Sequence, residues 1–346
     1  MIVAVSHRGD PHARAVLARL RRLGAKAILL DLAELPGRGR IALAFGRGRR
    51  DAVVATRAGV LRARDVSAVW WRRPRPLRAD LRLAPGDAAF AVRETAEVLI
   101  GLAASTRARW VNDPWRDGVA SRKPHQLALA ERCGLAVPAT LVTNDPRRAR
   151  AFLTARSRAF VHKGLGAFPE DWRPTRLVSS RDVSRLPALR FAPVVLQEYV
   201  PGVDVRVTVV GRTLFATEID ARRTTSPEDF RPVLAAARVR PCALPRDLAR
   251  RLRALVSALG LAFAAVDLRR RDDGEHVFLE VNPSGQWLFL EERTGQPITE
   301  AVARLLAGGG VSGRARRARR PGRAGARARG RANGPARAGR RGRPRP

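Results

Sequence analysis

The first hundred residues alternate between two hydrophobic periods. Short apolar runs fit buried strands, and longer segments with apolar residues three or four positions apart fit amphipathic helices. In residues 11–23 the apolar face carries Val16, Leu17 and Leu20, and Gly24 follows as a helix stop. The predicted strands are Ile2–Ser6, Ala27–Asp31, Ala52–Thr56 and Val66–Arg72, and the predicted helices are Pro11–Leu23 and Ala88–Thr106. This order predicts a small α/β domain of βαβ type with a mainly parallel sheet.

The pattern changes after residues 110–114, and strands dominate from residue 193 onward. Asp145 is placed to cap a helix that begins at Pro146, and Asp272-Asp273-Gly274 is a typical hairpin turn. The further predicted strands are Ala139–Thr143, Ala159–Lys163, Val194–Val200, Val203–Val210, Thr213–Asp220, Phe263–Arg271 and His276–Val281, and the further helices are Lys123–Cys133, Arg246–Leu259 and Ile298–Leu306. The second half is therefore expected to be mainly strands with a few helices, including one hairpin over residues 263–281.

The net charge of +36 is unevenly distributed. Residues 307–346 contain 14 Arg and no acidic residue, so subtracting these 14 leaves +22 for residues 1–306. The tail is nearly all Arg, Gly, Ala and Pro, which predicts disorder because it has too little apolar surface to bury. A basic field attracts nucleic acid, acidic peptides and polyphosphates alike. Charge alone therefore does not select a function.

Composition sets broader limits. A chain of 346 residues with 45% hydrophobic residues is long enough for two or three domains with buried cores. It contains no run of about 18–20 apolar residues, the length that a membrane span needs. The two cysteines, Cys133 and Cys242, form neither a disulfide framework nor a metal motif. We therefore expect a cytoplasmic protein with no membrane partner.

Lysine is rare in this chain. Of 67 basic residues only Lys26, Lys123 and Lys163 are lysines, so a retained lysine indicates a need for a compact ammonium group rather than a guanidinium. Lys163 ends an apolar strand and precedes a loop with Gly164 and Gly166, a combination that suits a nucleotide polyphosphate. Lys123 begins a helix and is placed to approach the same phosphates. The alternative is that each lysine only solvates the surface.

Oxygen ligands cluster at the predicted hairpin of residues 263–281. Glu280 and Asn282 share one face of a strand because side chains alternate, and Asp267 lies in the preceding strand. Mg²⁺ prefers a few carboxylates completed by water and substrate phosphates. The alternative is a solvated sheet face without metal.

A third group surrounds the turn Pro201-Gly202. Before it lies Gln197-Glu198-Tyr199-Val200, and after it Asp204 and Arg206 share a strand face. Asp204 fits a contact to ribose hydroxyls, and Arg206 fits a contact to a phosphoryl group. The alternative is a surface ion pair of little energetic value.

The order of these groups resembles that of ATP-grasp enzymes, over roughly residues 110–305. The resemblance implies an ATP-grasp fold in which ATP is clamped between two sheets, with the domain before it as the usual leading domain. The expected boundaries are 1–108 for that pre-ATP-grasp α/β domain, 109–192 for a lid of α+β type, 193–306 for the large subdomain and 307–346 for the tail.

The resemblance also implies roles for individual residues. Phosphate contacts fall to Lys123 and Lys163, adenine contacts to the segment containing Gln197, Glu198, Tyr199 and Val200, and the ribose contact to Asp204. The magnesium ligands are Asp267, Glu280 and Asn282, and the catalytic arginines are Arg206 and Arg231. The implied cofactors are ATP and Mg²⁺. The loop after Lys163 departs from the family pattern because it lacks a Ser/Gly-rich run.

Three further stretches resemble the graspetide maturases of microviridin type, which are related to ribosomal-protein glutamate ligases. They are Trp70–Pro74, Arg109–Pro114 and Asn282–Leu288 with Glu291 and Thr294-Gly295. The resemblance implies an ADP-forming ligase that activates Asp or Glu side chains of a ribosomal precursor peptide as acyl phosphates. Ser, Thr or Lys of the same peptide then closes a lactone or lactam. It also implies a leader segment on the peptide and leaves a homodimer open.

Two other functions remain open on the sequence alone. A ligase that adds an amino acid to a protein or peptide terminus would use the same residues. A protein that binds nucleic acid or the ribosome would use the Arg/Gly tail, although the aromatic content is only 5% and the body shows no nucleic-acid module. Trp287 also fits simple core packing.

Overall fold

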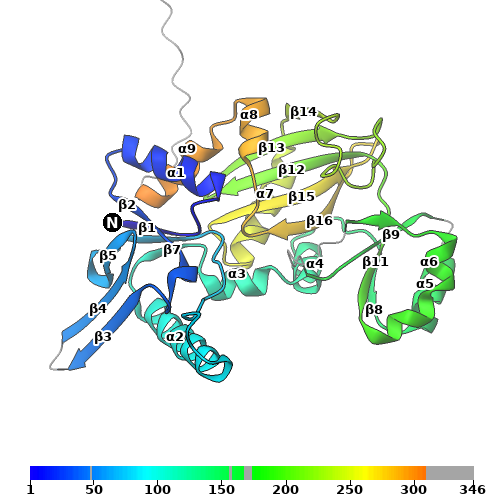
Figure 1. Cartoon of the computed structure of the whole chain (residues 1–346). Coiled ribbons are helices and arrows are strands. Elements are labelled where there is room, and N and C mark those ends of the chain that lie inside the picture. The colour runs from blue at the N-terminus through cyan, green and yellow to red at the C-terminus, as the bar shows by residue number, and fades with distance from the viewer. Residues whose placement is uncertain (47–48, 156–157, 167–173, 309–346) are drawn as a thin grey trace, which may run out of the picture. The chain divides into compact units, whose positions relative to one another are not determined.

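The computed structural model describes residues 1–46, 49–155, 158–166 and 174–308, and these belong to a compact unit that spans Met1–Val311. Figure 1 labels the elements along the chain. Disorder was predicted for residues 307–346. Residues 309–346 lie outside the described residues, so this stays a prediction. No helix in the described part is long and apolar enough to cross a membrane.

The first sheet is parallel, as predicted. Its strand order is β2-β1-β6-β7, with all three pairings parallel. The strands are β1 (Ile2–Val5), β2 (Ala27–Leu30), β6 (Ala68–Trp71) and β7 (Arg109–Val111). Helix α1 (Pro11–Arg22) connects β1 to β2, and the Asp10 carboxylate caps it by accepting from the His12 N–H at 3.0 Å. The apolar periods therefore predicted both the elements and the sheet type.

A second, antiparallel sheet lies between β2 and β6 in the sequence. It consists of β3 (Arg40–Gly46), β4 (Arg49–Thr56) and β5 (Gly59–Arg62). The predicted strand Ala52–Thr56 is part of β4, so it does not join the parallel sheet. The reason is local: β4 and β5 form a hairpin, with Thr56 paired to Gly59, and Gly59 has a φ of 127° that suits glycine.

The parallel sheet is covered on both faces. One face packs against α1 and α9 (Ile298–Ala307), which lie side by side in Figure 1. The other face packs against the β4–β5 hairpin and α2 (Pro85–Ser105). Burial on both faces explains why β1 and β6 read as continuous apolar runs rather than as alternating patterns.

A four-stranded antiparallel sheet follows, with the order β10-β9-β11-β8. Its strands are β8 (Thr140–Thr143), β9 (Phe160–Lys163), β10 (Arg176–Leu177) and β11 (Val194–Glu198). Helix α5 (Pro146–Thr154) packs against it, and the Asp145 carboxylate caps α5 as predicted. Helix α6 (Ser180–Ser184) and a 3-10 segment (Leu186–Phe191) complete this region.

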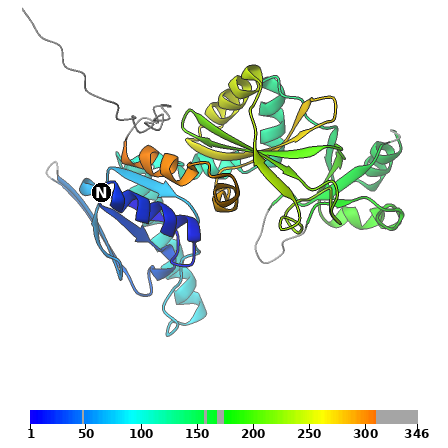
Figure 2. The ribbon, with the colours of Figure 1, turned by 90° about the horizontal axis from the view of Figure 1, so that it is seen from above.

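The largest sheet has five antiparallel strands in the order β14-β13-β12-β15-β16. They are β12 (Val203–Val210), β13 (Thr213–Asp220), β14 (Arg238–Pro241), β15 (Phe263–Arg270) and β16 (His276–Asn282). Helices α7 (Arg246–Ala258) and α4 (Lys123–Arg132) cover one face of this sheet (Figure 2). Val205, Val207 and Leu268 are buried on that face. The opposite face is polar over β12, β15 and β16.

Three short helices were not predicted: α3 (Pro114–Ala120), α6 and α8 (Leu288–Thr294). They have seven, five and seven residues, too few for a hydrophobic period to stand out. The predicted domain boundaries stay a prediction, and β7, which begins at residue 109, is the fourth strand of the first sheet.

Candidate ATP and magnesium site

A row of charged side chains crosses three neighbouring strands of the five-stranded sheet. The registers pair Arg206 on β12 with Asp267 on β15, and Asp267 with Glu280 on β16. Arg206 donates two hydrogen bonds to the Asp267 carboxylate, at 2.7 and 2.6 Å. This bidentate geometry orients both groups and raises the pKa of Arg206, although burial opposes that rise. The alternation of side chains therefore brings together a cation and two anions.

Both predicted lysines lie at the end of this row. The Lys123 ammonium, at the start of α4, donates a hydrogen bond to Glu280. Lys163, at the end of β9, donates to the Gln197 side-chain oxygen at 2.9 Å. Burial lowers the pKa of Lys163 to about 8, with Glu280 opposing and Lys123 adding to that shift. Burial acts to raise the pKa of Glu280, but Lys123 and Lys163 lower it below its usual range.

Asp204 lies two residues before Arg206, on the same face of β12. The Arg269 guanidinium donates to its carboxylate at 3.3 Å. Burial raises the pKa of Asp204 to about 7, with Arg269 opposing that rise. Asp204 is thus next to the row, but its pairing with Arg269 was not predicted.

Arg231 follows the loop after β13 and is held by Asp229. Its guanidinium donates to the Asp229 carboxylate at 2.7 and 2.5 Å. Burial acts to lower the pKa of Arg231, but Asp229 and the charges of Glu280 and Asp267 raise it. Because these two charges act on Arg231, it lies close to the row. The structure therefore brings Lys123, Lys163, Arg206, Arg231, Asp267 and Glu280 into one cluster.

The segment Gln197–Val200 ends β11 and continues into the turn. Glu198 is 6% exposed, and its carboxylate forms ion pairs with Arg158 at 2.5 Å and Arg271 at 3.6 Å. The N–H groups of Glu198 and Tyr199 donate to backbone carbonyls. Val200 differs: it is 2% exposed, yet its backbone N–H and C=O have no hydrogen-bond partner among the described residues. These free groups suit the edge of an aromatic base better than the Glu198 side chain does.

Asn282 is the last residue of β16, directly before the loop that leads to α8, and it is exposed. Its side-chain oxygen accepts from the Ser284 N–H at 3.0 Å, which fixes the turn. Further along, the guanidinium of Arg72, at the end of β6, donates to the carbonyls of Ser284 and Gly285 at 2.5 and 2.8 Å. Arg72 is 1% exposed, so the leading domain holds the loop that follows Asn282.

Asn112 and Trp287 tie the same loop to the leading domain. The Asn112 amide donates to the carbonyls of Phe263 and Pro283 and accepts from two backbone N–H groups, so all its hydrogen-bonding groups are used. Trp287 is fully buried, and its ring lies 4.6 Å from that of His12. The interpretation of Trp287 as a core residue is therefore confirmed.

Asp117 on α3 is an anion beside this loop that sequence reasoning missed. Burial raises its pKa to about 6, and Arg72 opposes the rise only in part. One of its carboxylate oxygens is buried without a hydrogen-bond partner. Asp117 and Arg269 were missed because each depends on a contact with a residue of another element. Asp229 contacts Arg231 two residues along the same loop, but no role was assigned to it. The sequence did point to Arg72, because it lies in the stretch Trp70–Pro74 that resembles the graspetide maturases. No role was assigned to it.

The donor set fits Mg²⁺. The carboxylates of Asp267 and Glu280 lie on adjacent strands, and the amide of Asn282 follows two residues after Glu280. Two carboxylates and an amide suit Mg²⁺, because this ion commonly completes its coordination with water and phosphate oxygens. The four cations around these anions, together with the free backbone of Val200, also fit a nucleotide triphosphate.

Comparisons with known proteins agree with this geometry. Residues 1–117 match the family model of the MvdD pre-ATP grasp domain. Macrocyclase MdnB from Microcystis aeruginosa MRC shares 29% identity (TM-score 0.75), and macrocyclase MdnC from the same organism, bound with precursor peptide MdnA, shares 26% (TM-score 0.78). Each comparison covers 89% of this chain and 99% of the other.

A third structure is the ATP-grasp ligase PsnB, complexed with a phosphomimetic variant of its minimal precursor, Mg and ADP. It shares 24% identity with a TM-score of 0.71, covering 89% of this chain and 97% of PsnB. No curated protein matches the chain. The fold and the site make the chain an ATP-grasp ligase. Within that class it resembles the macrocyclases that act on ribosomal peptides.

Proposed function

We propose that the chain is an ADP-forming macrocyclase of a ribosomal precursor peptide, with ATP and Mg²⁺ as cofactors. The observation that carries this proposal is the charged row of Arg206, Asp267 and Glu280, with Lys123 and Lys163 at its end. MdnC and MdnB, which share the fold over nearly their whole length, are macrocyclases, and PsnB is solved with Mg and ADP. The products are ω-ester or ω-amide links.

The reaction has two steps. A side-chain carboxylate of the peptide attacks the γ-phosphorus of ATP, which forms an acyl phosphate and releases ADP. A hydroxyl or amine of the same peptide then attacks the acyl carbon, releasing phosphate and one proton. Mg²⁺, when bound, neutralises phosphate charge and aligns the transferring group. The protein contributes position and charge rather than a covalent intermediate.

The cations have distinct tasks in this proposal. Lys123 and Lys163 hold phosphate oxygens. Before the nucleotide binds, Lys123 is held by Glu280 and Lys163 by the Gln197 side-chain oxygen. Arg206 is fixed by Asp267 and stabilises the phosphoryl group in transfer. Arg231, which is oriented by Asp229, binds the carboxylate of the peptide in this proposal.

The nucleotide contacts follow from the remaining residues. The free backbone N–H and C=O of Val200 bind the adenine edge, beside Gln197, Glu198 and Tyr199. Asp204 binds the ribose hydroxyls, and this contact favours its ionised form. Asp267, Glu280 and Asn282 hold Mg²⁺. The predicted subdomains 109–192 and 193–306 then form the two sides of the nucleotide site.

The substrate in this proposal is an acidic peptide that carries Ser, Thr or Lys as acceptors. MdnC is bound with precursor peptide MdnA, and the positive charge of this chain favours an acidic partner. A ligase that adds an amino acid to a terminus remains the second candidate, because the same site would activate a terminal carboxylate. Cytoplasmic location and homodimer formation are further parts of the proposal.

The experiment is an ADP-release assay with Mg-ATP and the short peptide encoded beside this gene, followed by mass spectrometry. A macrocyclase removes one water per ring, whereas a terminus-extending ligase adds the mass of an amino acid. Glu280→Gln abolishes the product, and Glu275→Gln, an exposed acid of the same hairpin, serves as the matched control. ADP release without any change in peptide mass contradicts the proposal.

A further inference from the structure

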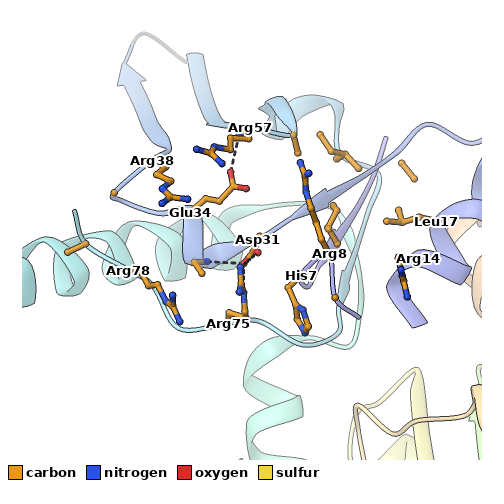
Figure 3. A pocket seen from close by; sticks show the side chains of 18 of the residues that line it. His7, Arg8, Arg14, Leu17, Asp31, Glu34, Arg38, Arg57, Arg75 and Arg78 are labelled. Carbon is orange, nitrogen blue, oxygen red and sulfur yellow. Dashed lines mark hydrogen bonds and ion pairs between the residues drawn. The ribbon is translucent and has the colours of Figure 1, made fainter. Parts of the chain in front are cut away.

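A large basic pocket lies in the leading domain, and the proposed reaction does not use it. Its volume is about 2180 Å³, at least twice that of a typical small-molecule site. Its cationic or titratable lining residues are His7, Arg8, Arg14, Arg21, Lys26, Arg38, Arg57, Arg75 and Arg78, and its acidic ones are Asp31, Glu34 and Asp80. Figure 3 shows several of these side chains around the pocket. The size and charge fit a segment of an acidic chain.

The cations of this pocket are largely without acidic partners. Arg75 pairs with Asp31, and Asp80 pairs with Arg82. By contrast, no ion pair within the described part of the chain involves Arg14, Arg21, Lys26, Arg38 or Arg57, and the first three are exposed. Unpaired cations around a concave surface produce a positive field that attracts anions.

The floor of the pocket includes the free edge of a sheet. Ala27, Ile28 and Leu29 of β2 line it, and β2 pairs only with β1 among the described residues. The Ile2 N–H donates to the Lys26 carbonyl, so the backbone carbonyl of Lys26 points toward β1 and away from the pocket. The Ser6 N–H donates to the Leu30 carbonyl in the same way. Because backbone groups alternate along a strand, those of Ala27 and Leu29 point outward to the pocket.

The cations flank this edge on both sides. Arg14 and Arg21 project from the exposed side of α1, which covers one face of the parallel sheet. Arg57 lies in the turn of the β4–β5 hairpin, which covers the other face, and Arg38 lines the same side (Figure 3). An added strand would therefore place side chains of both faces against positive charge.

We infer that this basic pocket along the free edge of β2, called the β2 edge pocket from here on, binds an acidic segment of the precursor peptide. The segment binds in extended form, as an additional strand on β2. Backbone hydrogen bonds to Ala27 and Leu29 supply affinity, and the flanking cations select Asp and Glu on both faces of the segment. This segment is a part of the peptide other than the side chains being cyclised. The identity of the occupant rests on the proposed function, but the binding mode does not.

The first test is direct binding to the full-length protein without nucleotide. The probe is a fluorescein-labelled peptide, (Glu-Glu-Thr)4, measured by fluorescence anisotropy. The comparison peptide (Glu-Glu-Pro)4 has the same charge but cannot form a regular strand. The inference requires that the first peptide binds more tightly by about fivefold or more, roughly the value of one net backbone hydrogen bond. Equal binding of both peptides overturns it.

The second test changes the strand edge without changing charge. Ala27→Pro removes an outward N–H, and proline is tolerated at such edge positions, whereas Ala27→Val keeps the N–H. We expect Ala27→Pro to weaken (Glu-Glu-Thr)4 binding about fivefold and Ala27→Val to leave it unchanged. Thermal unfolding of both variants checks that each is folded. Equal affinity of the two folded variants contradicts strand addition.

The third test separates the pocket from the rest of the basic surface. Arg14→Glu/Arg21→Glu reverses two pocket charges, and Arg107→Glu/Arg212→Glu reverses two exposed arginines outside the pocket. The first pair should weaken peptide binding about tenfold more than the second. If the pairs are equal, or if an oligo(dT) probe shows the same response to Ala27→Pro, the pocket is a general anion surface and the inference fails.

The precursor peptide itself distinguishes this inference from the proposed function. Ala27→Pro should raise the KM for the precursor with kcat unchanged, because the pocket binds but does not react. If the wild-type chain forms no ring from any precursor but binds (Glu-Glu-Thr)4 in the expected way, the proposed function fails and the strand-addition mode stands.

Discussion

The ATP site and the β2 edge pocket use positive charge in opposite ways. In the ATP site, Arg206 is paired with Asp267 and Lys123 with Glu280. In the pocket, Arg14 and Arg21 are exposed and have no ion pair among the described residues. Buried charges need partners because desolvation of a lone ion is very costly, whereas exposed charges keep their water. The paired charges of the first region are therefore held in a defined geometry, whereas the unpaired charges of the second region attract anions.

This comparison teaches where specificity resides. An ion pair that is already formed holds its members in position, and an incoming Mg²⁺ or phosphate then exchanges for one partner. A field from unpaired cations acts at longer range but is weakened by salt. Each region should therefore respond to a different perturbation.

The largest expected effect is at Glu280. Glu280→Gln removes the anion that pairs with Lys123, carries a charge close to Lys163 and is a proposed ligand of Mg²⁺. We expect the rate of ADP formation to fall about 100-fold or more. The coupled ADP-release assay measures it, with Glu275→Gln as control. A residual rate within about threefold of wild type would show that the row is not the reaction site.

The second effect, at Arg206, separates charge from geometry. Arg206→Lys keeps the charge but replaces a planar fork, so the bidentate contact to Asp267 is lost. We expect kcat to fall about 10- to 100-fold. The matched control is Arg212→Lys, an exposed arginine in the turn after the same strand. Full activity of Arg206→Lys would mean that a point charge is sufficient there.

The third effect is on pH-dependent stability at Asp117, beside the loop that follows Asn282. The pKa of Asp117 is raised to about 6, so its protonated form stabilises the fold. That contribution is complete below the unfolded pKa and is lost as pH rises through about 6. Asp117→Asn should therefore gain stability relative to wild type between about pH 5 and 7.5, by about 1–2 kcal/mol.

Urea unfolding at the two pH values measures this gain. Asp113→Asn is not a suitable control, because Asp113 caps α3; Asp273→Asn, in the exposed hairpin turn, is better suited. A stability difference between wild type and Asp117→Asn that is the same at both pH values would contradict the raised pKa.

The smallest effect is that of salt on the two regions. Raising NaCl from about 50 to about 300 mM should weaken binding of the acidic probe several-fold through the exposed cations. The paired charges of the ATP site are screened less, so the KM for ATP should change by less than about twofold. Isothermal titration with each ligand checks this. An equal response of both ligands would remove the distinction between the two regions.

Much of the fold was predictable because hydrophobic period reports burial directly. The strands Val203–Val210 and Thr213–Asp220 were predicted with the bounds that the structure shows. The hairpin of β4 and β5 was not, because its residues alternate only partly and its pairing is decided by the turn. Short helices such as α3 lack a period long enough to detect.

Part of the site was predictable for a chemical reason. The rarity of lysine singled out Lys123 and Lys163, and strand alternation placed Glu280 and Asn282 on one face. The roles of these residues stay predictions until they are tested. Contacts between distant segments, such as Arg72 with Ser284, depend on how domains pack, and no local pattern reports them.

The scarcity of lysine has a practical consequence for chemical labelling. An amine-reactive reagent meets only three lysine side chains in this protein. Because the pKa of Lys163 is lowered to about 8, a larger fraction of its amine is neutral, and therefore nucleophilic, than for an ordinary lysine at neutral pH. Acylation followed by peptide mapping thus reports on the two lysines of the candidate ATP site, Lys123 and Lys163, and protection of these two by Mg-ATP becomes a footprint of the nucleotide.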